Sequence, residues 1–253
     1  MSGLAAEARN PGHQYEMLST KAIPVDERLI LALDVSSVAE AQQLVITLGD
    51  SVRFYKLGLE LFMAGGYYEL LDWLNERGKK TFVDLKFFDV PNTVASAIRQ
   101  LKGHHPVFAT VHGNDAILRA AVQEKNGIKI LAVTVLTSLD DADLQALGFQ
   151  VDAEALVLSR AERALKIGCD GVISSGLEAK QLRSELGENF LIVVPGIRPI
   201  ANVDDQKRTV DVEEAFERGA DYIVVGRPIR SSTDPRAAAQ DIQRRIASLF
   251  ANK

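Results

Sequence analysis

Residues 82–89 contain three charged side chains within an otherwise apolar run. Asp84 and Lys86 stand two residues apart, and Asp89 follows. In a strand, this spacing points Asp84 and Lys86 to the same face. Lys56 also lies within a short apolar run. Buried charges are costly unless they are paired, so they are rarely placed there for stability alone. We predict that these four residues form a catalytic array of alternating cations and carboxylates.

Several kinds of chemistry are open to such an array. Opposite charges side by side keep each group ionised, so Lys86 is better suited to be a cationic acid than a nucleophile. A Schiff base would need a neutral amine. A divalent metal held by the oxygens of Asp34, Asp84 and Asp89 is a second possibility, but the interleaved lysines disfavour it. A purely structural ion-pair cluster is the third. We predict the cationic acid and no metal site.

The elements that position these residues follow a regular rhythm. Eight short apolar or β-branched runs recur along the chain, and each is followed by a longer stretch with the periodicity of a helix. These runs are residues 29–35, 53–57, 80–85, 107–112, 128–136, 171–174, 191–194 and 222–225. The stretches 39–48, 67–77, 93–101 and 117–123 place apolar residues three and four apart, as amphipathic helices do. Alternating strands and helices predict a parallel sheet with right-handed crossovers.

The number of these units predicts the architecture. Eight units without a long linker favour closure into an α/β fold, the (β/α)8 TIM barrel, whose typical length is about 250 residues. A doubly wound open sheet is the alternative, but residues 34–37 read DVSS where its Gly-rich turn would stand. We predict one catalytic domain over residues 26–253. Residues 1–25 lack the pattern of a signal peptide, and we expect a disordered extension there.

The composition limits the kinds of binding partner that the chain can have. The net charge of −5 disfavours a broad surface for nucleic acid or an anionic membrane, so we expect neither partner. An anionic ligand must then be bound by a local basic site. The single cysteine, Cys169, excludes an internal disulfide and a Cys-rich metal site. It favours a cytoplasmic location.

The ends of the last two strands supply that basic site. In a barrel they form the usual phosphate-binding position, which here holds residues 195–199 (PGIRP), Gly226 and Arg227. Gly226 allows a backbone N–H to approach an oxygen closely, and Arg227 adds a bidentate cation. Residues 200–209, which include Gln206, are long and polar enough for a lid. These features predict a small phosphorylated substrate.

Six segments spread over nearly the whole chain carry a family resemblance. They are 31–34 (LALD), 55–58 (YKLG), 84–93 (DLKFFDVPNT), 133–138 (VTVLTS), 195–199 (PGIRP) and 226–228 (GRP). In this order they resemble the orotidine 5′-phosphate decarboxylase family of bacterial type. The segment 84–93 is highly specific, whereas Gly-Arg-Pro alone is not. The resemblance implies a barrel that converts orotidine 5′-phosphate to UMP without a cofactor.

The resemblance also implies roles for the charged array. Lys86 would stabilise the carbanion at pyrimidine C6 and then protonate it. Asp84 would lie beside the substrate carboxylate, with Lys56 and Asp89 completing the array. Asp34 and Lys56 would hold the ribose hydroxyls.

Further contacts are implied at the rest of the substrate. Thr137 or Ser138 would meet the pyrimidine edge. The phosphate would be bound by Arg198, Gln206, Gly226 and Arg227. In the family, the residues matching Asp89 and Thr93 reach across a dimer interface into the partner's site. A homodimer is therefore the expected functional unit.

Two rival functions remain open. Hexulose-phosphate synthases and keto-gulonate-phosphate decarboxylases share an Asp-x-Lys-x-x-Asp motif and use Mg²⁺ with an enediolate. The continuation 90–93 (VPNT) and the segment 195–199 favour the nucleotide enzyme. A barrel that binds nucleotides without turnover is the other rival. The presence of all the motifs that carry the resemblance disfavours it. His112 follows the fourth strand, and we expect a structural or supporting role for it.

Overall fold

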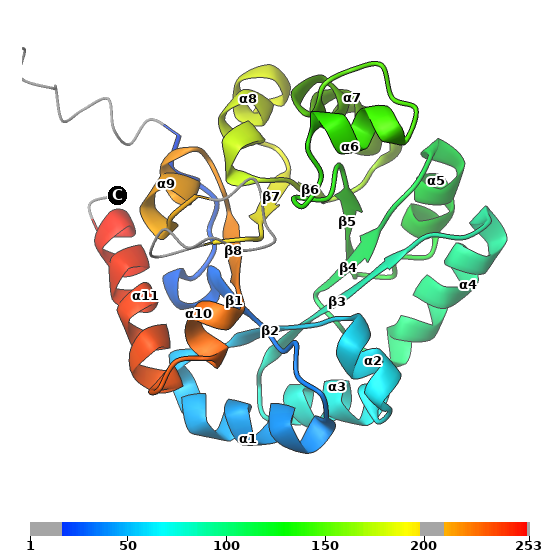
Figure 1. Ribbon diagram of the computed structural model, residues 1–253. Helices are drawn as coiled ribbons and strands as arrows, with labels where there is room; N and C mark the ends of the chain where they lie inside the picture. The colour runs from blue at the N-terminus through cyan, green and yellow to red at the C-terminus, as the bar shows by residue number, and fades with distance from the viewer. Residues whose placement is uncertain (1–16, 198–209, 252–253) are drawn as a thin grey trace, which may run out of the picture.

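The computed structural model describes residues 17–197 and 210–251. Eight parallel strands close into a barrel in chain order, and the first strand pairs with the last (Figure 1). They are β1 (Leu29–Ala32), β2 (Phe54–Leu57), β3 (Lys80–Phe87), β4 (Phe108–Val111), β5 (Lys129–Val133), β6 (Gly171–Ile173), β7 (Leu191–Val194) and β8 (Tyr222–Val225). Each lies within or overlaps one predicted run. The predicted (β/α)8 TIM barrel is confirmed.

Helices surround the barrel (Figure 1). They are α1 (Val38–Leu48), α2 (Leu59–Ala64), α3 (Tyr67–Glu76), α4 (Pro91–Leu101), α5 (Asp115–Gln123), α6 (Asp141–Ala146), α7 (Ala153–Ile167), α8 (Gly176–Leu186), α9 (Val212–Glu217), α10 (Arg227–Arg230) and α11 (Pro235–Phe250). Short 3-10 turns occur at η2 (Val25–Glu27), η3 (Gly49–Ser51) and η4 (Lys102–His104). Among the helices described, none has the length and apolar character needed to cross a membrane.

Polar caps fix where several helices begin. Ser37 accepts a hydrogen bond from the Glu40 backbone N–H at the start of α1, and Asn114 accepts two at the start of α5. Asp152 caps α7 in the same way. Each such cap is worth about 1 kcal/mol because it satisfies a backbone donor that has no partner within the helix. The caps of α1 and α5 therefore place these two helix starts directly after the loops at the ends of β1 and β4, whereas α7 follows α6.

Aromatic side chains fill the barrel interior beneath the charged residues. Phe54 and Phe82 each stand two residues before a charged position, Lys56 and Asp84 respectively, and so face the same interior. The ring of Phe108 lies 5.1 Å from that of Phe54 and 5.7 Å from that of Phe82. This apolar layer closes the barrel below Lys56 and Asp84 and keeps water from reaching them from that side.

The fold begins earlier than the sequence indicated. Residues 1–25 were expected to be a disordered extension, but residues 17–25 are described and contact the barrel. Ser19 Oγ donates to Asp221 Oδ1 at 2.5 Å, and Lys21 Nζ lies 3.1 Å from the same oxygen. For residues 17–25 the expectation was therefore wrong, because a polar anchor leaves no periodic apolar signal. Residues 1–16 lie outside the described part.

Candidate active site

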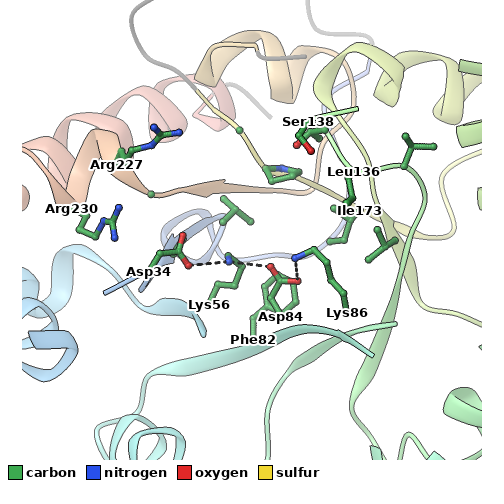
Figure 2. Close-up of a pocket in the computed structure, with 18 residues that line it drawn as sticks. Asp34, Lys56, Phe82, Asp84, Lys86, Leu136, Ser138, Ile173, Arg227 and Arg230 are labelled. Atoms are coloured by element: carbon green, nitrogen blue, oxygen red, sulfur yellow. Dashed lines mark hydrogen bonds and ion pairs between the residues drawn. The ribbon is translucent and has the colours of Figure 1, made fainter. Parts of the chain in front are cut away.

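A cavity of about 570 Å³ opens at the carboxyl ends of the strands (Figure 2). In the described part of the chain, its wall comes from the end of every strand except β4. The lining residues are Ala32, Asp34, Lys56, Phe82, Asp84, Lys86, Val133, Val135, Leu136, Thr137, Ser138, Ile173, Pro195, Gly196, Val224, Gly226, Arg227 and Arg230. This is the end of a barrel at which catalytic sites form.

Four charged side chains form a continuous row across one wall of this cavity. Lys56 Nζ lies 3.5 Å from Asp34 Oδ1 and 3.0 Å from Asp84 Oδ2. Lys86 Nζ donates to the other Asp84 oxygen, Oδ1, at 2.9 Å. Figure 2 shows the order Asp34, Lys56, Asp84, Lys86 along the row. Strands β1, β2 and β3 bring these groups together, so neighbouring strand ends supply alternating charges.

The row keeps its central members ionised. Burial opposes the charged form of Asp84, but Lys56 and Lys86 outweigh this effect and lower the pKa of Asp84 to about 2. Burial would also lower the pKa of Lys56, but Asp84 and Asp34 outweigh it and raise that pKa. Asp84 is therefore a carboxylate and Lys56 an ammonium at neutral pH. The arrangement can present fixed cations to a substrate without any proton being exchanged beforehand.

Lys86 reaches Asp84 through an irregular backbone. We expected regular strand alternation to place the two side chains on one face, but the pairing of β3 with β4 shifts between Val83 and Phe87. Lys86 itself has a φ of 47°, in the left-handed region. The side chains do meet, and the buried hydroxyl of Thr110 contacts both residues. Sequence reasoning did not identify Thr110.

Comparison with known proteins identifies the family. The family model described as "Orotidine 5'-phosphate decarboxylase / HUMPS family" matches residues 27–242. The chain belongs to this family. A protein of Methylococcus capsulatus named orotidine 5′-phosphate decarboxylase is 60% identical over 236 residues, which cover 92% of this chain and 98% of that protein. One of the same name from Stenotrophomonas maltophilia is 52% identical over 229 residues, with coverages of 89% and 95%.

A solved structure of the family has the same fold. The crystal structure of orotidine 5′-phosphate decarboxylase from Lactobacillus acidophilus superposes with a TM-score of 0.78 at 36% identity. The match covers 87% of this chain and 99% of that chain. Membership in the family, which we inferred from six short segments, is thus confirmed over almost the whole barrel.

Further residues expected from the family resemblance also lie in the cavity. They are Thr137, Ser138, Gly226 and Arg227. Arg230 lines the cavity as well, three residues beyond Arg227 in α10, and was not predicted. The helical spacing of three was the signal that could have found it. Two expected phosphate ligands, Arg198 and Gln206, and the predicted lid at 200–209 lie outside the described residues.

Asp89 and Thr93 do not line the cavity of their own chain. Both are exposed, and Asp89 Oδ1 accepts a hydrogen bond from the Val90 backbone N–H at 2.6 Å. Two apolar side chains beside them are also exposed, Phe88 at 68% and Val90 at 62%. The array within one chain therefore ends at Lys86. The role of Asp89 and Thr93 in a partner's site stays a prediction.

His112 lines a neighbouring cavity of about 350 Å³ together with Phe88 and Arg160. Burial lowers the pKa of His112, and the charges of Arg160 and Lys86 lower it further. The imidazole is therefore neutral at pH 7. His112 does not line the main cavity, and its supporting role stays a prediction.

Proposed function

We propose that this chain is a carboxy-lyase that converts orotidine 5′-phosphate to UMP in pyrimidine nucleotide biosynthesis, without a cofactor. The observation that carries the proposal is the row Asp34–Lys56–Asp84–Lys86 at the mouth of the barrel. Relatives that are 52–60% identical and named orotidine 5′-phosphate decarboxylase support it. They favour the nucleotide substrate over the sugar phosphates of the sister enzymes.

The chemistry requires a fixed cation. When the bond between C6 and the carboxylate breaks, CO2 leaves and the electron pair stays on C6, in the plane of the ring. The carbonyl π system cannot delocalise a pair in that plane. The Lys86 ammonium, held by Asp84 at 2.9 Å, would stabilise this charge. A proton from Lys86 would then move to C6, giving UMP and leaving a neutral amine.

Electrostatic stabilisation by one ammonium does not account for the whole lowering of the activation barrier. Enzymes lower barriers by about 8 to 23 kcal/mol, and a single cation cannot supply the upper part of this range. Binding energy from the remote phosphate is the natural supplement. In our proposal Gly226 and Arg227 bind the phosphate, together with Arg198 and Gln206 from the segment outside the described residues.

The other substrate contacts follow once the phosphate lies at Gly226 and Arg227 and the pyrimidine at Lys86. Asp34 and Lys56 would hold the ribose hydroxyls, between the phosphate end and the Lys86 end of the cavity. Thr137 or Ser138 would bind the edge of the pyrimidine. All four residues line the same cavity, which supports a single substrate orientation.

The proposed activity is tested by mixing the purified protein with orotidine 5′-phosphate in excess EDTA. We expect the ultraviolet band of the orotate ring to disappear and UMP to form in equal amount. Nucleotide binding without turnover would instead support a regulatory barrel. An unchanged band, followed by activity on a sugar phosphate after Mg²⁺ is added, would assign the chain to the sister enzymes and make the aspartates metal ligands.

Replacing Arg227 by alanine tests the phosphate end. We expect kcat/KM for orotidine 5′-phosphate to fall about 10- to 100-fold, because a charge-assisted hydrogen bond worth about 1.5–3 kcal/mol is lost. Orotidine, which lacks the phosphate, is the matched control substrate. The kcat/KM for orotidine should be the same for the wild-type and Arg227→Ala proteins. Equal losses on the two substrates would contradict a phosphate role for Arg227.

We also propose that the active unit is a homodimer in which Asp89 and Thr93 enter the partner's cavity. Their exposure beside Phe88 and Val90 supports this, since clustered exposed apolar side chains mark interaction surfaces. Within the described part of the chain, the carboxylates that line the cavity are Asp34 and Asp84. This is consistent with a further acid that a partner supplies.

Mixing two inactive variants tests the shared site. Lys86→Ala and Asp89→Ala proteins should each be poorly active alone. After unfolding and refolding together in equal amounts, half the dimers should be mixed, and each mixed dimer would hold one intact site. Activity should then recover to about a quarter of the wild-type value. If Asp89 acts in its own chain, no mixed dimer has an intact site and no recovery will occur.

We further propose a cytoplasmic location, which the single cysteine supports. Cys169 is buried and unpaired, and burial raises the pKa of its thiol to about 12. The thiol is therefore unreactive at neutral pH and has no part in the proposed reaction.

A further inference from the structure

The pairing of β3 with β4 is interrupted beside the charged row. Val83 pairs with Ala109, and Phe87 pairs with Val111. Between these pairs, three residues of β3 (84–86) stand opposite one residue of β4, Thr110. Such a bulge bends the strand and removes regular partners from its backbone groups. The irregularity falls on the two residues, Asp84 and Lys86, that hold the reacting ammonium.

The side chain of Thr110 supplies a partner for one backbone group of the bulge, the Lys86 N–H. Its hydroxyl oxygen accepts a hydrogen bond from the Lys86 backbone N–H at 3.0 Å. The same hydroxyl donates to Asp84 Oδ1 at 2.9 Å. That oxygen also accepts from Lys86 Nζ at 2.9 Å. The three hydrogen bonds form a closed ring that joins the backbone of Lys86 to its own ammonium.

The ring surrounds a residue with an uncommon backbone conformation. A φ of 47° is uncommon for any residue with a side chain, and it persists only where the surroundings hold it. Thr110 is fully buried, so water cannot replace its hydroxyl as a partner. It does not line the cavity. Its influence on a bound substrate must therefore pass through Asp84 and Lys86.

We propose that Thr110 is a positioning residue for the decarboxylation: its hydroxyl holds Lys86 in the left-handed conformation and fixes its ammonium against Asp84. The inference rests on the proposed function. It predicts an effect on the chemical step rather than on binding, because the substrate would meet the ammonium and not the hydroxyl.

The test compares three variants. Thr110→Val removes the hydroxyl at nearly constant volume, and Thr110→Ser keeps the hydroxyl. Thr134→Val is the matched control, since Thr134 is also fully buried, lies just beyond β5 and donates to the Ile173 carbonyl at 2.7 Å. For Thr110→Val we expect kcat to fall about 10- to 100-fold, as for a displaced catalytic group, while KM stays within about threefold. Thr110→Ser and Thr134→Val should keep kcat within about threefold of wild type.

Two outcomes would overturn the inference. One is a Thr110→Val enzyme whose kcat matches the wild type. The other is an equal loss of kcat in Thr134→Val, which would show a general effect of deleting a buried hydroxyl. If Thr110→Val does not fold, Thr110→Cys against Thr110→Ser decides: a loss of kcat in the cysteine variant alone supports the role, and equal activity refutes it. A wild-type protein that leaves orotidine 5′-phosphate unchanged would refute the proposed function itself.

Discussion

Replacing Lys86 by alanine is expected to lower kcat for orotidine 5′-phosphate by at least about 10⁴-fold, because one group would lose two roles. Electrostatic stabilisation by a fixed donor contributes about 10²–10³ in rate, and general acid catalysis about 10²–10⁴. The variant should fold, because Asp84 keeps its ion pair with Lys56 at 3.0 Å. Steady-state kinetics, with the unfolding temperature measured alongside, provides the test.

Lys80→Ala is the control for this variant. Lys80 begins the same strand, β3, at the opposite end of the barrel, and its ammonium pairs with Glu27 rather than with the charged row. We expect its kcat to remain within about twofold of the wild-type value, since surface ion pairs contribute little even to stability. A Lys86→Ala enzyme that kept about a tenth of the wild-type rate would remove Lys86 from the centre of the mechanism.

Replacing Asp221 by asparagine is expected to lower the free energy of unfolding by about 3–5 kcal/mol, the cost of breaking a buried ion pair. Its carboxylate lies 2.6 Å from Arg183 Nη2, and both side chains are 0% exposed. It also accepts from the Ile192 backbone N–H and contacts Ser19 and Lys21. Among the described residues, losing the charge would leave the buried Arg183 cation with only the half-exposed Glu188, 3.8 Å from its Nε, as a carboxylate partner. Urea unfolding would measure the change.

Asp170 offers a matched position for this substitution. It precedes β6 as Asp221 precedes β8, and its Oδ2 accepts from the Ile130 backbone N–H at 2.9 Å. Its partner Lys125 is partly exposed, so Asp170→Asn should cost only about 1 kcal/mol. Equal losses at the two positions would show that the buried pair is no more important than the backbone hydrogen bond.

The architecture could be predicted from the sequence because its signals are local. Short apolar runs such as 191–194 and 222–225 became β7 and β8 with the same bounds. Charged residues inside apolar runs identified Lys56 and Asp84, because few structures other than a site place charges there. These predictions required only periodicity and the cost of burying charge.

The features that escaped prediction depend on contacts between distant segments. In the sequence, Thr110 is an ordinary β-branched strand residue. Its role appears only when the register of β3 against β4 places it opposite the bulge. The anchoring of Ser19 to Asp221 joins residues 202 positions apart, and no local pattern marks it. Arg230 enters the cavity only because α10 begins directly after β8.

A crystal structure of the protein with bound UMP would test the central claim most directly. We predict the nucleotide in the cavity at the strand ends, with pyrimidine C6 about 3–3.5 Å from Lys86 Nζ, the separation at which reacting atoms meet. The phosphate should lie at Gly226 and Arg227, and the ribose at Asp34 and Lys56. A nucleotide bound in another cavity, or with C6 turned away from Lys86, would contradict the assignment of this row as the decarboxylation site.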